Sequence, residues 1–181
     1  KLKDAAYAAV ISWKNCLDIS DEGQDAAAEV KEQLRQKREA RNKAKQEKDK
    51  AKEEETFAAK PIPEKQQKML EAFDTYVQYV PDAPELVTIK YRRARVYYEY
   101  NHLDKAIPLF KDLAENYPKS ELALYSANLL LDSIAIKINF DKEKADEYVT
   151  MMEQQVDKFQ GMPDLTKDKD FDETLKKIKA S

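Results

Sequence analysis

Apolar side chains recur three and four residues apart along most of this chain. That spacing places them on one face of an α-helix, because a helix completes a turn every 3.6 residues. Prolines and turn-forming residues interrupt the pattern and separate one helix from the next. The pattern therefore predicts amphipathic helices at residues 2–18, 64–80, 85–100, 104–117, 120–139, 141–161 and 168–179.

Capping residues set the expected starts of three of these helices. Asp104, Ser120 and Asp141 each stand before an apolar-periodic segment. A side-chain oxygen there can accept a hydrogen bond from the first helical turn, so we expect all three to be N-caps. Pro118 cannot continue a helix, and Gly161 is a typical residue at a C-terminal end.

Residues 24–60 have a different character. Between Lys31 and Glu55 nearly every residue is Lys, Arg, Glu, Gln or Ala, and Leu34 is the only large aliphatic side chain. Opposite charges four apart, such as Glu39 and Lys43, support an exposed helix, and the lack of an apolar seam disfavours a coiled coil. The segment is either a solvated helix or partly disordered charged insertion, or an arm that contacts a partner or a membrane surface.

Composition narrows the fold and function classes. The chain of 181 residues contains 2 glycines, which disfavours turn-rich β folds and favours an all-α protein. The formal net charge of −3 lacks the basic excess of a nucleic-acid binder. No apolar run is long enough to span a membrane, and the first residues show no signal-peptide pattern.

The residues that usually carry chemistry are sparse. Cys16 is the single cysteine and His102 the single histidine, so neither a disulfide nor a clustered metal site is expected. We interpret Cys16 as a small, buried apolar residue on a helix and His102 as a solvated turn residue. We therefore expect no catalytic residue, no metal and no cofactor, and a protein that is not an enzyme.

The clearest regularity is a helical hairpin between Val87 and Ser120. Two small residues, two aromatic residues, a leucine and a terminal proline occur at fixed spacings: Ala94, Tyr97, Ala106, Phe110, Leu113 and Pro118. This unit resembles a tetratricopeptide repeat (TPR), a hairpin of 34 residues that stacks into a solenoid. Asn101 stands where the family often has glycine, and Arg93 where it usually has leucine.

The resemblance implies a TPR-like solenoid of helical hairpins with a long charged helical insertion. Residues 1–23 would form the first repeat helix, 24–60 the insertion or arm, 61–160 the repeats, and 161–181 a C-terminal turn and short helix. The endings Tyr79–Asp82 and Tyr117–Ser120 resemble repeat ends of TPR proteins in the bacterial cell envelope. That likeness implies a location in the periplasm or at the outer membrane; otherwise the protein is expected in the cytoplasm.

The same resemblance implies a site for a protein partner. Tyr91, Arg95 and Tyr98 share a second face of their helix, which lines the concave groove in the family. The corresponding side chains of the next unit are Tyr125, Leu129 and Asp132. We expect a scaffold or adaptor that binds a partner helix or peptide there, unless these side chains merely pack against a neighbouring helix. The alternative function is a structural spacer in which the charged segment is the working part.

Overall fold

The protein is all-α in the residues that its computed structural model describes, which are 2–16, 31–32, 34–40, 42–43, 57–80, 82–83 and 85–180. No strand occurs among them. The helices, in chain order, are α1 (Leu2–Cys16), α4 (Glu64–Tyr79), α5 (Leu86–Glu99), α6 (Leu103–Asn116), α7 (Glu121–Phe140), α8 (Ala145–Gln160), α9 (Pro163–Thr166) and α10 (Lys169–Lys179). The all-α prediction is thus confirmed for this part of the chain.

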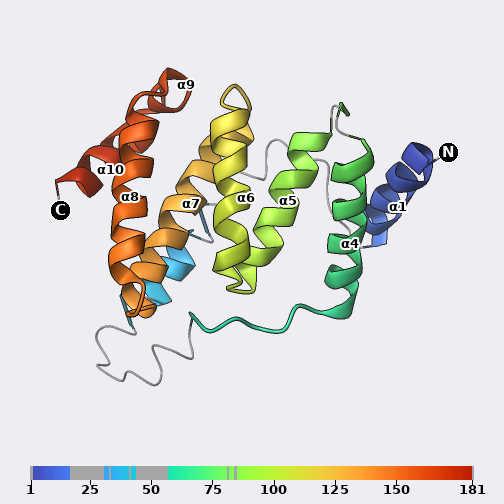
Figure 1. The fold of residues 1–181 in the computed structure, drawn as a ribbon, viewed down its shortest axis with the longest axis horizontal. Helices are drawn as coiled ribbons and strands as arrows, with labels where there is room; N and C mark the ends of the chain where they lie inside the picture. The colour runs from blue at the N-terminus through green and yellow to red at the C-terminus, as the bar shows by residue number, and fades with distance from the viewer. Residues whose placement is uncertain are drawn as a thin grey trace.

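The helices pack as neighbouring antiparallel pairs. Contacts join α1 to α4, α5 to α6, and α7 to α8, and each pair also touches the next through α4–α5 and α6–α7. Figure 1 shows this row running from α1 at one end to α8 and α10 at the other. The α5–α6 and α7–α8 pairs are consecutive in sequence, whereas α1 meets α4 across the charged segment.

Helix boundaries agree with the apolar periodicity to within a few residues. Ser120 is the N-cap of α7 and accepts a hydrogen bond from the Leu122 amide at 3.2 Å, as predicted. Asp168 caps α10 in the same way, through the Phe171 amide at 2.8 Å. Gly161 follows the last residue of α8, also as predicted.

Two predicted N-caps are wrong. Helix α6 begins at Leu103, so Asp104 lies inside its first turn, and Asp141 ends α7 rather than starting α8. Both carboxylates pair with Lys137 instead: its ammonium lies 3.0 Å from the Asp104 carboxylate and 2.8 Å from that of Asp141. The pair with Asp104 connects the start of α6 to the end of α7.

Small residues allow the central helices to approach closely. Ala94 on α5, Ala106 and Ala114 on α6, and Ala127 on α7 are all fully buried. Phe110 lies beside them on α6, with its ring 6.1 Å from that of Tyr98 and 6.4 Å from that of Tyr91. This cluster extends through α7, α8 and α10 and forms the larger part of the core.

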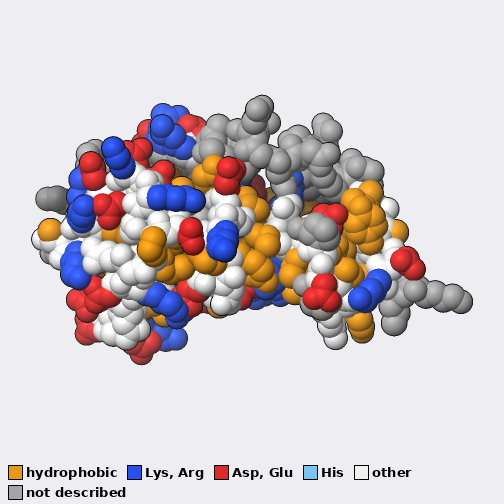
Figure 2. Space-filling view, turned by 90° about the horizontal axis from the view of Figure 1, so that it is seen from above, with side chains coloured by type: hydrophobic (Ala, Val, Ile, Leu, Met, Phe, Trp, Pro, Cys, Tyr) orange, Lys and Arg blue, Asp and Glu red, His pale blue; other side chains and the backbone are white. Residues whose placement is uncertain are grey.

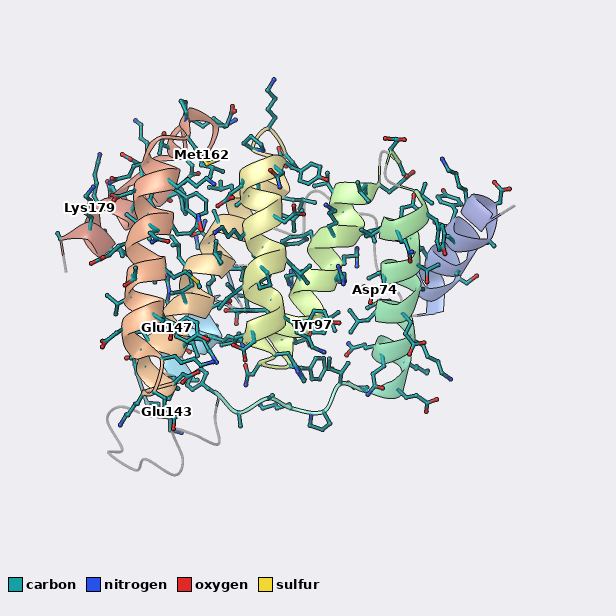
Figure 3. The ribbon with its side chains drawn as sticks, viewed as in Figure 1. Asp74, Tyr97, Glu143, Glu147, Met162 and Lys179 are labelled. Atoms are coloured by element: carbon teal, nitrogen blue, oxygen red, sulfur yellow. The ribbon has the colours of Figure 1, made fainter. Side chains whose placement is uncertain are left out.

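A second, smaller cluster lies between α1, α4 and one side of α5. It includes Phe73 and Tyr76 of α4, each 1% exposed. Tyr97 packs against both clusters, and an ion pair between Arg93 of α5 and Asp74 of α4 spans the same junction. Figure 3 shows Asp74 on the side of α4 that faces α5. Arg93, which departs from the repeat pattern, therefore has a structural partner here.

The outer surface carries both charge signs. Figure 2 shows basic and acidic side chains interspersed over one face, with hydrophobic side chains between them. Ion pairs such as Lys158 with Glu115, at 2.7 Å, connect neighbouring helices. Among the helices that the structure describes, none combines the length and apolar character needed to cross a membrane.

Phe110→Ala should lower the free energy of unfolding by about 3–5 kcal/mol, because it removes a fully buried ring and leaves a cavity. Urea denaturation followed by circular dichroism measures this change. Val149→Ala, at a side chain that is 41% exposed, is the matched control and should stay within about 0.5 kcal/mol of the wild type. Equal losses for both variants would contradict the core described above.

Candidate partner-binding site

The residues predicted to bind a partner lie on two helices that contact each other, and a hydrogen bond links the two groups. Tyr91, Arg95 and Tyr98 lie on α5, and Tyr125, Leu129 and Asp132 lie on α7. We call these six residues the α5–α7 face. The two helices contact each other directly, and the Tyr98 hydroxyl donates a hydrogen bond to Asp132 Oδ2 at 2.8 Å.

Four of the six residues are buried rather than open to solvent. Tyr91 is 3% exposed, Tyr98 and Leu129 are 0%, and Asp132 is 5%. Sequence reasoning treated Tyr97, rather than Tyr98, as the aromatic residue of the core, but Tyr98 is fully buried and Tyr97 only partly buried. The role of the six residues in partner binding stays a prediction.

Arg95 and Tyr125 are partly buried. The Arg95 guanidinium lies 5.8 Å from the centre of the Tyr91 ring, a distance at which a cation–π attraction contributes. Burial raises the pKa of the Tyr125 hydroxyl, and the carboxylates of Glu121 and Asp168 add to the rise. The hydroxyl therefore stays protonated and can donate a hydrogen bond at neutral pH.

The chain's own charged segment lies against the α5–α7 face. The described residues between 31 and 43 are helical, and Figure 1 draws them in pale blue beside α7. Leu34 is 9% exposed and joins the same buried cluster as Tyr98 and Leu129. The predicted insertion therefore docks on the helical core over residues 34–40, while residues 17–30 and 44–56 lie outside the described part of the chain.

Lys37 makes the most specific polar contacts of this segment. Its ammonium donates to the Tyr98 carbonyl at 2.9 Å and to Asn101 Oδ1, and lies 4.2 Å above the centre of the Tyr98 ring. Burial lowers the pKa of Lys37 to about 8; Lys60 adds to the fall, and Asp132 and Glu99 oppose it. Docking therefore removes water from the Lys37 ammonium, and the attraction of Asp132 and Glu99 only partly offsets the cost of that desolvation.

The contacts that dock this segment contribute only a modest stabilisation. Burying the Leu34 side chain contributes about 2 kcal/mol. Arg38 Nε is 4.0 Å from Asp132 Oδ1 while half of the Arg38 side chain is exposed, so this pair adds at most about 1 kcal/mol. On the other side of the segment, Arg35 pairs with Glu32 and Glu39 and all three are well exposed. The segment thus docks by one face only.

The segment that follows is fixed by the turn between α5 and α6. Asn101 has a φ of 60°, the left-handed conformation expected where the repeat family has glycine. Its side-chain amide donates to the Ala58 carbonyl at 3.2 Å, and His102 Nε2 donates to the Lys60 carbonyl at 2.8 Å. His102, predicted to be solvated, therefore helps to hold residues 58–60 against the turn between α5 and α6.

Aromatic stacking secures the start of this extended stretch. The Phe57 ring lies 4.3 Å from that of Phe140, at the end of α7, with an interplanar angle of 26°. Figure 1 shows residues 57–63 running from there along the base of the helices to α4. Sequence reasoning missed this anchor, although a phenylalanine after a long charged run was a signal that could have indicated it.

No family model, curated protein or solved structure matches this chain. Within the described ranges, no group of three or more His, Cys, Asp or Glu side chains is arranged to hold a metal ion. Cys16 lies in α1, but its side chain is outside the described set, so the prediction of its burial is untested. The geometry of the α5–α7 face therefore carries the functional argument.

The docking of Lys37 should strengthen as pH rises. Its pKa is about 8 when docked and returns to an ordinary 10.5 when released. Between these values the docked form binds fewer protons than the released form, so a rise in pH favours docking; below pH 8 both forms are charged. NMR titration of the Lys37 side chain should give a midpoint near 8, and Leu34→Asp should move it toward 10.5. A midpoint near 10.5 in the wild type would refute the buried contact.

Asn101→Gly should unfold at higher urea than Asn101→Ala, by about 1 kcal/mol, because alanine is strained at a positive φ and glycine is not. Both variants lose the side-chain bonds to Lys37 and Ala58, so their difference isolates the backbone. In both, the Lys60 amide, which donates to the Tyr100 carbonyl at 2.9 Å, should exchange its hydrogen faster than in the wild type. Equal stability of the two variants would argue against the left-handed turn.

Proposed function

We propose that this protein is an interaction module, a TPR-type scaffold or adaptor, that binds a helix of a protein partner on its α5–α7 face. The observation that carries the proposal is the helical segment already seated there, through Leu34 and Lys37. A surface that holds one helix supplies the apolar contact and the polar acceptors that another helix needs. The mechanism is geometric: the packed helices hold these groups at fixed positions before the partner arrives.

The repeat pattern supports this proposal. Ala94, Ala106, Phe110 and Leu113 are fully buried, as the repeat family requires of these positions, and the helices pair in chain order. The repeat endings at Tyr79–Asp82 and Tyr117–Ser120 support membership of the bacterial cell-envelope group, with a place in the periplasm or at the outer membrane. Pro81, within the first ending, is outside the described residues.

A structural spacer whose charged segment is the working part remains the second candidate. Leu34 and Ala40 dock on the larger core cluster, so the repeats anchor the segment at a defined point. This anchoring favours the spacer hypothesis. The two candidates place the binding determinants on opposite sides of the same contact. The first puts them on the repeats, and the second puts them in the segment.

Affinity capture from the source cells, read by mass spectrometry, tests the first candidate. In an open variant, Leu34→Asp with Lys37→Glu releases the segment and should increase the amount of partner captured. Adding Arg95→Glu and Tyr125→Ala to that variant should reduce capture at least tenfold, equivalent to about 1.4 kcal/mol, because both changes fall on the α5–α7 face. Circular dichroism must show equal helicity for both proteins.

Two controls make the result specific. Lys111→Glu with Lys119→Ala changes exposed residues at α6 and the turn that follows it, and should leave capture unchanged. Deleting residues 33–55 separates the two candidates, since it removes the charged segment but keeps the α5–α7 face. If that deletion abolishes capture while the Arg95 and Tyr125 changes do not, the spacer hypothesis replaces the first.

A further inference from the structure

The docked segment presents one apolar and two basic side chains to the α5–α7 face. Leu34 enters the core cluster, and Lys37 and Arg38, three and four positions later, contact polar groups on α5, on the turn after it and on α7. Residues three and four apart lie on one side of a helix, so these contacts form a single stripe. Gln36 and Glu39 fall on the exposed side and contribute nothing to this stripe.

The repeats offer preformed hydrogen-bond acceptors for the amino group of a lysine. The Tyr98 carbonyl, the Tyr98 ring and Asn101 Oδ1 surround Lys37 Nζ from different directions. Asn101 belongs to a tight turn with a fixed backbone conformation, and Tyr98 is fully buried. Because these groups are held by the fold rather than by Lys37, they would meet a cation from another helix in the same geometry.

A buried carboxylate next to this site favours a second cation. The Asp132 side chain is 3% exposed. The Tyr98 hydroxyl binds its Oδ2 atom, while Oδ1 faces Arg38 Nε at 4.0 Å. Charge-assisted bonds between a guanidinium and a carboxylate reach about 2.7–2.9 Å, so this contact is loose.

The chain's own segment is suited to exchange. Leu34 is the only large aliphatic residue between Lys31 and Glu55, so apolar burial anchors the segment weakly. A free helix as short as residues 31–43 is marginal in water, because nucleation is costly and few hydrogen bonds follow. Once it leaves the face, the segment therefore gains conformational freedom that opposes its return.

We propose that the α5–α7 face selects basic amphipathic helices in which a leucine is followed three and four positions later by lysine and arginine, and that residues 31–43 are the internal competitor which such a partner helix displaces. This inference rests on the proposed function and names the class of partner. The competitor has the advantage of being tethered, since an attached ligand acts at an effective concentration of about millimolar. A free helix therefore binds the intact chain more weakly than it binds an opened one.

Fluorescence anisotropy with a labelled peptide of residues 31–43 tests the inference on the full chain. The open variant, Leu34→Asp with Lys37→Glu, should bind this peptide at least about tenfold more tightly than the wild type does. Reversing the peptide charges at Lys37 and Arg38 to glutamate should weaken binding to the open variant at least about tenfold. Changing Asp132 to Asn in the open variant should likewise weaken binding of the original peptide.

A matched variant controls for the substitutions themselves. Arg35→Glu with Glu39→Lys alters the exposed side of the same helix and should leave peptide binding at the wild-type level. If the open variant is poorly folded, Arg38→Glu replaces it, because this half-exposed side chain can change without disturbing the core. Trypsin cleavage within residues 34–40 reports release of the segment and should be faster in either opened protein.

The outcomes separate this inference from the proposed function. Equal binding of the original and charge-reversed peptides to the open variant would overturn the selectivity for basic helices while leaving a helix-binding face. Absence of binding by both peptides, with trypsin showing a released segment, would overturn the inference alone if capture still depends on Arg95 and Tyr125. If that dependence is also lost, the proposed function fails with it.

Discussion

The close approach of α5, α6 and α7 is the constraint on which the other features depend. Ala94, Ala106 and Ala127 are fully buried where these helices meet, and larger side chains there would push the helices apart. The close approach of the helices brings Tyr98 of α5 within hydrogen-bonding distance of Asp132 of α7. That contact places an aromatic ring, a carbonyl and a carboxylate on one face, and the charged segment docks on that face.

The turn after α5 connects this face to the rest of the chain. Asn101 accepts a hydrogen bond from Lys37 and donates one to the Ala58 carbonyl, so one side chain contacts residues on both sides of the undescribed stretch 44–56. His102 adds a bond to Lys60. The insertion is therefore fixed near both the start and the end of this stretch by neighbouring residues of a single turn. Asn101 itself adopts the left-handed backbone conformation, with a φ of 60°, at this turn.

Sequence reasoning predicted the helices well because their signals are local. Apolar spacing, Pro118 and Ser120 act within one or two turns, and a single hairpin contains them. It also assigned Tyr98 and Asp132 to one candidate site, through the resemblance to the repeat family, in which these positions correspond in successive units. It did not predict the pairing of Lys137 with Asp104, since that contact forms only after α6 and α7 have packed, and it also missed the local pairing of Lys137 with Asp141 four residues later.

The docking of residues 34–40 was missed for a related physical reason. A segment rich in charge is typical of solvated helices, and a single Leu34 gives no periodic signal. Lys37 is charged and partly buried only because the fold supplies acceptors from α5 and its turn. The environment of Lys37 depends on the tertiary structure, and no short stretch of sequence contains both Lys37 and the residues that it contacts.

The pairing of α1 with α4 has a consequence for the order of folding. The pairs α5–α6 and α7–α8 join neighbours in sequence and close short loops, which is a fast process. Helix α1 must instead find α4 across the whole charged insertion, and the entropy lost on loop closure grows with loop length. Docking of residues 34–40 on preformed α5 and α7 divides that loop into two shorter ones. The N-terminal helix therefore joins the structure late, and the seated segment shortens the search that it must complete.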